Sequence, residues 1–244
     1  MWSINLYAHD FEVGGIYYNI LSSTEVEVSC RGDLSYDYFD EYTGSVVIPE
    51  RVTYNGTTYT ITSIGKDAFE LCSGLTEITI PNSVITIGNC AFYNYENWKE
   101  IIVYDNTTHI GEYAFANCLS LSNVVLGKNI KEIGNYTFDD STRIKSVYVY
   151  ADTPPTIYQE TFTVHTTVNA TLYTPKGKLN NYAKASYWKY FFDIQEDLSA
   201  IETVTIDADN TPTEYYDLSG RRVIEPTHGI YIMKQGSTVT KVVL

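Results

Sequence analysis

Hydrophobic residues recur every 23 positions through the middle of this sequence. An Ile-Gly pair begins at residues 64, 87, 110 and 133, and a phenylalanine follows each glycine four places later. These phenylalanines are Phe69, Phe92, Phe115 and Phe138. Further columns of Leu, Ile and Val keep the same register, so the pattern predicts an internal repeat and not four unrelated segments.

Each repeat also contains a short stretch in which hydrophobic residues alternate with other residues. The alternating pairs are Ile78 and Ile80, Ile101 and Val103, Val124 and Leu126, and Val147 and Val149. This period of two predicts a β-strand that buries one face. Because one strand recurs in each repeat, we expect the strands to stack in parallel in a right-handed solenoid, mostly β with short turns and helical pieces.

The last repeat is irregular. Ile157 and Phe162 lie 24 residues after their counterparts, and Leu172 lies 25 residues after Val147. The glycine that marks the other repeats is missing here. Irregular terminal repeats are typical of the ends of solenoids, so the sequence predicts about five coils.

The segments on both sides of the repeats predict caps. Residues 1–60 form a β-rich N-terminal cap, with hairpin turn signals at Gly14-Gly15 and Asn55-Gly56. Residues 61–196 form the solenoid and its C-terminal cap. In that cap, Leu179 and Tyr182 have helical spacing, and Trp188 is expected to close the end of the stack.

The motif I-G-x-x-A-F-x-x-C-x-x-L-x-x-I-x-I-P at residues 64–81 resembles the BspA-like leucine-rich repeats of bacterial surface proteins. It is carried by Ile64, Gly65, Ala68, Phe69, Cys72, Leu75, Ile78, Ile80 and Pro81. The resemblance covers residues 61–196. It implies a curved solenoid with extracellular binding or adhesion roles, and it implies no catalytic residues.

The last part of the chain, residues 197–244, breaks the 23-residue period. Turn signals at Ser219-Gly220 and Gln235-Gly236 separate β-rich runs, which predicts a small antiparallel β module. The stretches YDLSGRRV at 216–223 and GIYI at 229–232 resemble C-terminal sorting domains of secreted Bacteroidetes-type proteins. This resemblance implies either a secretion signal or a retained β module.

Composition narrows the classes of partner. The chain has 244 residues, 44% of them hydrophobic, and a formal net charge of −14. An acidic chain without a basic run has little with which to neutralise phosphates, so we expect neither nucleic acid nor an anionic membrane surface as partner. No apolar run reaches the roughly 18–20 residues of a membrane-spanning helix, so no membrane insertion is expected. Residues 1–13 lack the pattern of a signal peptide, so any export signal is expected to be missing from this sequence.

Candidate catalytic or metal-binding chemistry is sparse. The cysteines, Cys30, Cys72, Cys90 and Cys118, form no C-x-x-C pair. Cys72 and Cys118 share a column two coils apart, roughly 10 Å, so they are expected to be buried thiols and not a disulfide. The histidines lie outside H-E-x-x-H, and no G-x-S-x-G or phosphate-binding loop occurs. The sequence therefore predicts no catalytic residue, metal or cofactor.

The strand residues between the buried columns are expected to face solvent. This outward column contains Thr79, Ile102, Val125, Tyr148 and Tyr173, with Tyr104 and Tyr150 beside it. An apolar and aromatic stripe is typical of a contact surface. The candidate ligand-binding residues are Ile102, Tyr104, Val125, Tyr148, Tyr150 and Tyr173. The alternative is that such residues simply suit strands and stack across them without any ligand.

These observations favour a non-catalytic binding or adhesion module, secreted or at the cell surface, that contacts a protein or glycan of a host or neighbouring cell. A structural or self-assembling spacer is the alternative, and a hydrolase of surface polymers is a third. The sequence leaves the ligand and the oligomeric state open.

Overall fold

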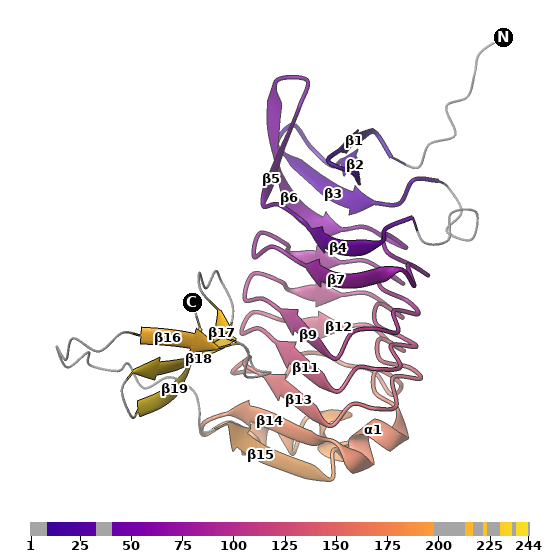
Figure 1. Cartoon of the computed structure of the whole chain (residues 1–244). Coiled ribbons are helices and arrows are strands. Elements are labelled where there is room, and N and C mark those ends of the chain that lie inside the picture. The colour runs from indigo at the N-terminus through magenta and orange to yellow at the C-terminus, as the bar shows by residue number, and fades with distance from the viewer. Residues whose placement is uncertain are drawn as a thin grey trace.

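The protein is a stack of coils in which each turn of the chain lies against the next (Figure 1). The computed structural model describes residues 9–32 and 41–197, together with the backbone of four strands beyond them. The repeating strands align in register, which confirms the predicted β-solenoid with its 23-residue spacing. About six coils are stacked, close to the number that the repeat pattern predicted.

From the coil that carries β9 onward, the longer strand of each coil belongs to one parallel sheet. Its members are β9 (Glu100–Val103), β11 (Asn123–Leu126), β13 (Ser146–Val149), β14 (Thr171–Pro175) and β15 (Asp193–Asp197). Ile101 pairs with Val124, and Val124 pairs with Val147. Val147 then pairs with Leu172, so the extra residues of the last repeat are accommodated outside the strand ladder.

The Ile-Gly pairs form a second ladder behind the first. The two-residue strands β8 (Thr86–Ile87), β10 (His109–Ile110) and β12 (Glu132–Ile133) pair in parallel next to β6 (Thr57–Ile64). The glycine that follows each strand is needed because neighbouring coils approach closely there. A Cβ at Gly88 would lie 2.7 Å from the Lys66 backbone nitrogen, and one at Gly134 would lie 2.6 Å from that of Glu112.

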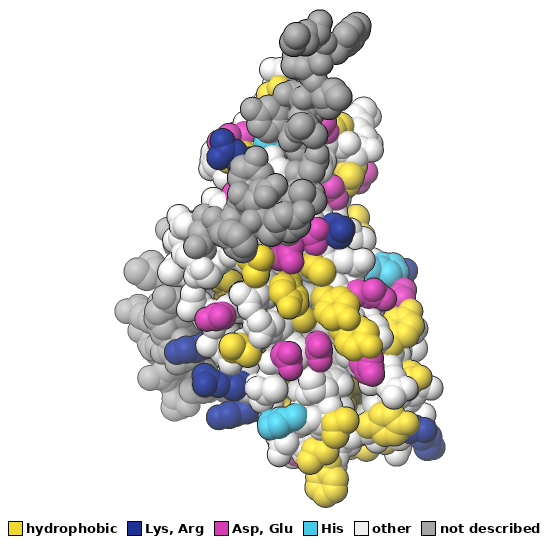
Figure 2. Space-filling view, turned by 90° about the vertical axis from the view of Figure 1, so that its right-hand side faces the viewer, with side chains coloured by type: hydrophobic (Ala, Val, Ile, Leu, Met, Phe, Trp, Pro, Cys, Tyr) yellow, Lys and Arg dark blue, Asp and Glu magenta, His cyan; other side chains and the backbone are white. Residues whose placement is uncertain are grey.

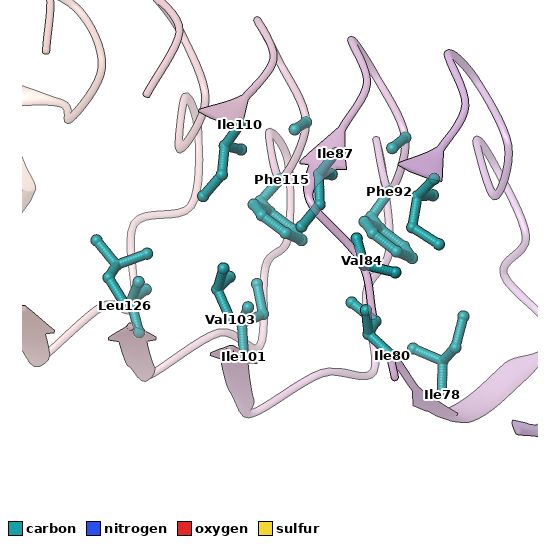
Figure 3. Close-up of a cluster of buried hydrophobic side chains, with 14 of the residues drawn as sticks. Ile78, Ile80, Val84, Ile87, Phe92, Ile101, Val103, Ile110, Phe115 and Leu126 are labelled. Atoms are coloured by element: carbon teal, nitrogen blue, oxygen red, sulfur yellow. The ribbon is translucent and has the colours of Figure 1, made fainter. Parts of the chain in front are cut away.

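A ladder of phenylalanine rings fills the space between the two sheets. Its members are Phe69, Phe92, Phe115, Phe138 and Phe162, whose successive ring centroids lie 5.2, 5.3, 5.8 and 4.9 Å apart. The rings are nearly parallel, with interplanar angles of 12° or less. Figure 3 shows Phe92 and Phe115 among aliphatic side chains of both sheets. The column that marked the repeat in the sequence is therefore the centre of the core.

The long turns between the two sheets form a third stacked side. They repeat two left-handed backbone positions in non-glycine residues, with φ between 52° and 62°. The first column is Asp67, Cys90, Tyr113 and Tyr136, and the second is Leu71, Asn94, Asn117 and Asp140. Each such residue costs roughly 1–2 kcal/mol. Hydrogen bonds between turns offset this cost, as where Phe92 N–H donates to Ala114 O at 2.9 Å.

The N-terminal segment contains both predicted hairpins. β1 (Phe11–Val13) and β2 (Ile16–Ile20) pair across Gly14-Gly15, and β5 (Arg51–Tyr54) and β6 pair across Asn55-Gly56. Two further strands behave as part of the stack. β3 (Glu25–Ser29) pairs in parallel with β6, and β4 (Gly44–Val47) pairs in parallel with β7 (Leu75–Thr79). The stacking therefore begins before residue 61 and includes a coil that lacks the repeat motif.

Short helices close the other end. α1 (Val164–Asn169) replaces the long turn of its coil and is capped by Thr163, whose side chain accepts the Thr166 N–H. α2 (Leu179–Tyr182) and the 3-10 helix η2 (Trp188–Tyr190) follow. Trp188 is fully buried against Phe162, and its Nε1–H donates to Pro155 O at 2.8 Å. This indole covers the last ring of the phenylalanine ladder.

The final strands pair among themselves. β16 (Thr213–Tyr216), β17 (Arg222–Val223), β18 (Ile230–Gln235) and β19 (Thr238–Val243) form an antiparallel sheet in the order β17-β16-β18-β19. The predicted antiparallel arrangement is confirmed for these strands. Much of the stretches at 216–223 and 229–232, including Ser219-Gly220, lies outside the described residues, so the resemblance to sorting domains stays a prediction.

Candidate functional site

The candidate surface is the outward face of the sheet formed by β9, β11, β13, β14 and β15. Ile102 pairs in register with Val125, Val125 with Tyr148, and Tyr148 with Tyr173. These residues therefore form the single column predicted from the sequence. Thr79 is not joined to it by strand pairing, because β7 pairs with β4 in a separate two-stranded sheet.

The column is less accessible than the sequence predicted. Val125 is only 1% exposed, so the expectation that it faces solvent is wrong. Ile102, Tyr148 and Tyr173 are partly buried, as are Tyr104 and Tyr150 beside them. Alternation along a strand predicts on which face a side chain lies, but it does not predict what else packs against that face.

The C-terminal half of the column is aromatic. The rings of Tyr148 and Tyr173 stack with centroids 4.5 Å apart and an interplanar angle of 9°. Burial, with Tyr173 next to it, raises the pKa of the Tyr148 hydroxyl. This hydroxyl is therefore a neutral hydrogen-bonding group at physiological pH. Two stacked phenol rings offer an apolar face with polar tips, which suits recognition of a protein or a sugar.

Tyr150 has a different role from its neighbours. Its hydroxyl donates to Asp197 Oδ2 at 3.0 Å, and Asp197 is 8% exposed. Burial and the Asp197 carboxylate raise the pKa of Tyr150 well above its ordinary value. The contact connects the end of β13 to the end of β15, so Tyr150 braces the sheet next to the stacked pair.

Residues 9–32 and 41–197 contain no group of three or more His, Cys, Asp or Glu that could hold a metal. None of the cysteines Cys30, Cys72, Cys90 and Cys118 is in a disulfide, and Cys72 and Cys118 are buried, as predicted. Burial raises the pKa of the Cys118 thiol to about 12, so this thiol is inert at neutral pH.

In the described part of the chain, no helix combines the length and the apolar character that crossing a bilayer requires.

A family model for the BspA type leucine rich repeat region matches residues 48–183 in six copies. The chain belongs to the BspA-type leucine-rich-repeat family. The match begins before residue 61, in agreement with strands that join the stack upstream of the first predicted repeat.

Several solved structures resemble this BspA-type chain in fold. The T. pallidum leucine rich repeat protein is 20% identical, with a TM-score of 0.44, over 57% of this chain and 71% of its own. The pneumococcal vaccine antigen PcpA is 18% identical, with a TM-score of 0.43, over 58% of this chain and 40% of its own. A leucine rich cell surface protein from Faecalibacterium prausnitzii A2-165 is 16% identical, with a TM-score of 0.42, over 87% of this chain and 59% of its own. The chain thus spans less than two thirds of the last two proteins, and no curated protein matches it.

Sequence reasoning missed one aromatic column entirely. Tyr113 and Tyr136 lie in successive long turns, and their rings stack with centroids 4.8 Å apart at 8°. They occupy the left-handed position at which earlier coils have Asp67 and Cys90. The 23-residue spacing of these two tyrosines is visible in the sequence, but they lie in turns and not in the strands from which the candidate site was predicted.

Proposed function

We propose that this BspA-type repeat protein is a non-catalytic extracellular or cell-surface binding module. Its outward sheet face contacts a surface protein or glycan of a host or neighbouring cell. The observation that carries the proposal is the stacked pair Tyr148 and Tyr173, aligned with Ile102 and Val125 on a sheet built from successive coils.

Each proposed contact residue has its own part. Tyr148 and Tyr173 supply ring faces and hydroxyls to the partner, and Ile102 and Tyr104 extend the apolar surface along β9. Val125 packs between Ile102 and Tyr148 in the same column and offers little surface itself, since it is buried. Tyr150 fixes the end of the sheet through Asp197.

A binding screen of the full chain against immobilised matrix proteins and a glycan array tests the function. The variant Tyr148→Ser with Tyr173→Ser is expected to lose at least tenfold in affinity for any captured partner, because aromatic anchors dominate such interfaces. Phe192→Ser is the matched control, since Phe192 is an aromatic residue 87% exposed outside this sheet. Unchanged affinity in the double variant would show that the assigned face is wrong.

The spacer alternative makes an opposite prediction for the chain without a partner. A self-assembling surface protein would associate as its concentration rises, and light scattering would detect this. A binding module gives a concentration-independent mass and captures a partner in the screen. Ordered self-association without capture would favour the spacer.

A further inference from the structure

An open groove of about 670 Å³ lies at the edge of the stack where the last long turn gives way to α1. Three segments line it: the turn that carries Tyr136 and Asp139, the residues from Ile157 through α1, and the region of η2. Figure 2 looks onto this edge and shows hydrophobic side chains and carboxylates side by side across it. The groove is separate from the outward sheet face and uses none of its residues.

The walls of the groove are apolar and aromatic. Tyr136, Tyr158, Tyr187 and Tyr190 line it, together with two valines of α1. Val164 is 79% exposed and Val168 is 55% exposed, and they lie four residues apart on one side of the helix. Exposed aliphatic side chains at the border of a concave surface are typical of a site that packs against a partner.

The groove carries two carboxylates that take part in no ion pair of the described residues. Asp139 and Glu160 line it, and none of the ion pairs within residues 9–32 and 41–197 involves either carboxylate. Burial and the neighbouring charges of Asp140 and Glu160 raise the pKa of Asp139. Its ionised carboxylate has no ion-pair partner among the described residues, and a bound cation would provide one.

Two of the lining tyrosines, Tyr136 and Tyr158, have hydroxyls that are already engaged by carboxylates. A hydrogen bond to Glu160 raises the pKa of Tyr136 to about 12, and Tyr158 donates to Glu132 Oε1 at 2.5 Å. The ring faces are therefore the parts of these tyrosines that a ligand can use, and Tyr136 offers only the face that does not stack on Tyr113. Lys189 shows that such a face accepts a cation, since its Nζ lies 5.5 Å from the centroid of the Tyr190 ring.

We propose that this groove binds an extended segment of a partner protein that presents an arginine between aliphatic residues. The guanidinium is planar, stacks on tyrosine faces and pairs with carboxylates through two parallel hydrogen bonds. Asp139 and Glu160 receive it beside Tyr136, and the aliphatic neighbours pack on Val164 and Val168. A neutral sugar would leave the two carboxylates without a counter-charge and the valines without an apolar contact.

Fluorescence anisotropy on the full chain tests the charge requirement without any mutation. The probe is a fluorescein-labelled peptide, Gly-Ser-Val-Arg-Val-Ser-Gly, and its control replaces arginine with citrulline, which keeps the shape and removes the charge. The arginine peptide is expected to bind at least tenfold more tightly, and raising NaCl from about 50 to 500 mM should weaken it severalfold. Equal binding of the two peptides would overturn the proposal.

Two double variants locate the site. Asp139→Asn with Glu160→Gln is expected to lower the affinity for the arginine peptide about tenfold or more. Glu50→Gln with Glu96→Gln makes the same change in net charge at exposed positions outside the groove, and it should leave the affinity within about twofold. Equal losses in both variants would mean that only the overall charge attracts the peptide.

A third arm separates this site from a glycan site and from the sheet face. Competition of cellohexaose with the peptide, in a manner abolished by the Asp139→Asn and Glu160→Gln changes, would identify a sugar site and contradict the proposal. The Tyr148→Ser, Tyr173→Ser variant is expected to bind the arginine peptide normally. The proposal for the groove and the proposal for the sheet face are therefore tested by separate measurements.

Discussion

At the scale of single residues, the repeated glycines show how little space separates neighbouring coils. Gly88, Gly111 and Gly134 follow the short strands, and at each one a Cβ would meet backbone atoms of the preceding coil. Backbone atoms cannot rotate away as a side chain can. Glycine is therefore required in this column by the close contact between coils. A left-handed backbone is not the reason, since these glycines are not among those with positive φ.

Substituting one of these glycines should be costly. Gly111→Ala places a Cβ 2.5 Å from the Asn89 backbone nitrogen, so we expect a loss of about 2–3 kcal/mol in the free energy of unfolding. Gly177→Ala is the comparison, because no atom lies within 4 Å there and only its φ of +76° opposes alanine. It should lose about 1 kcal/mol. Urea unfolding followed by circular dichroism measures both, and an equal loss would contradict the contact.

At the scale of elements, the phenylalanine ladder joins coils that are far apart in sequence. Phe115 is fully buried and contacts Phe92, Phe138 and Trp98. We expect Phe115→Ala to destabilise the protein by about 3–5 kcal/mol, because the change leaves a cavity between two ring neighbours. Phe192→Ala, at an exposed aromatic residue, should change stability by less than about 0.5 kcal/mol. Similar losses in the two variants would show that the ladder is not the core that joins the coils.

The elements also show where prediction from sequence succeeds. The strands that carry Ile101, Val124 and Val147 were predicted because each coil repeats the same contacts and therefore the same residue types. β3 and β4 were assigned only to a cap, although Val28 pairs with Ile64 and Val46 with Ile78. The spacing of β3 and β4 from the strands with which they pair differs from 23 residues. Parallel pairing between strands so far apart in sequence produces no local sequence pattern.

The candidate site was predicted less completely than the fold. Register alone placed Ile102, Val125, Tyr148 and Tyr173 in one column, as the structure does. The burial of Val125 and the contact of Tyr150 with Asp197 depend on parts of the chain that meet only after folding. The groove beside α1 depends on three separate segments, so no single stretch of sequence could indicate it.

At the scale of the whole molecule, buried tyrosines connect stability to pH. Burial raises the pKa of Tyr18 and of Tyr95 to about 12, and it raises the pKa of Tyr42, Tyr150 and Tyr182 further. In the unfolded chain these hydroxyls ionise near their ordinary value of about 10. Above that pH the unfolded state binds fewer protons than the native state, so the free energy of unfolding falls as pH rises.

The expected result is a melting temperature that declines steeply once the pH passes about 10. Each of these tyrosines contributes up to about 1.4 kcal/mol per pH unit between its unfolded and native pKa values. Thermal unfolding at a series of pH values from 8 to about 11.5, with absorbance near 295 nm recorded at each pH, tests this. A melting temperature that stayed constant up to the highest pH would contradict the burial of these hydroxyls.

The contact at the glycine column also bears on how such a molecule can change in length. Every coil from Gly88 to Gly134 presents the same close-fitting backbone to the coil before it and receives the same from the coil after it. A duplicated block of 23 residues, inserted between two of these coils, would make the same backbone contacts on both sides as the existing coils make. Insertion or deletion of whole units would move the terminal groove nearer to or farther from the N-terminal end in steps of about 4.8 Å, without any redesign of either end.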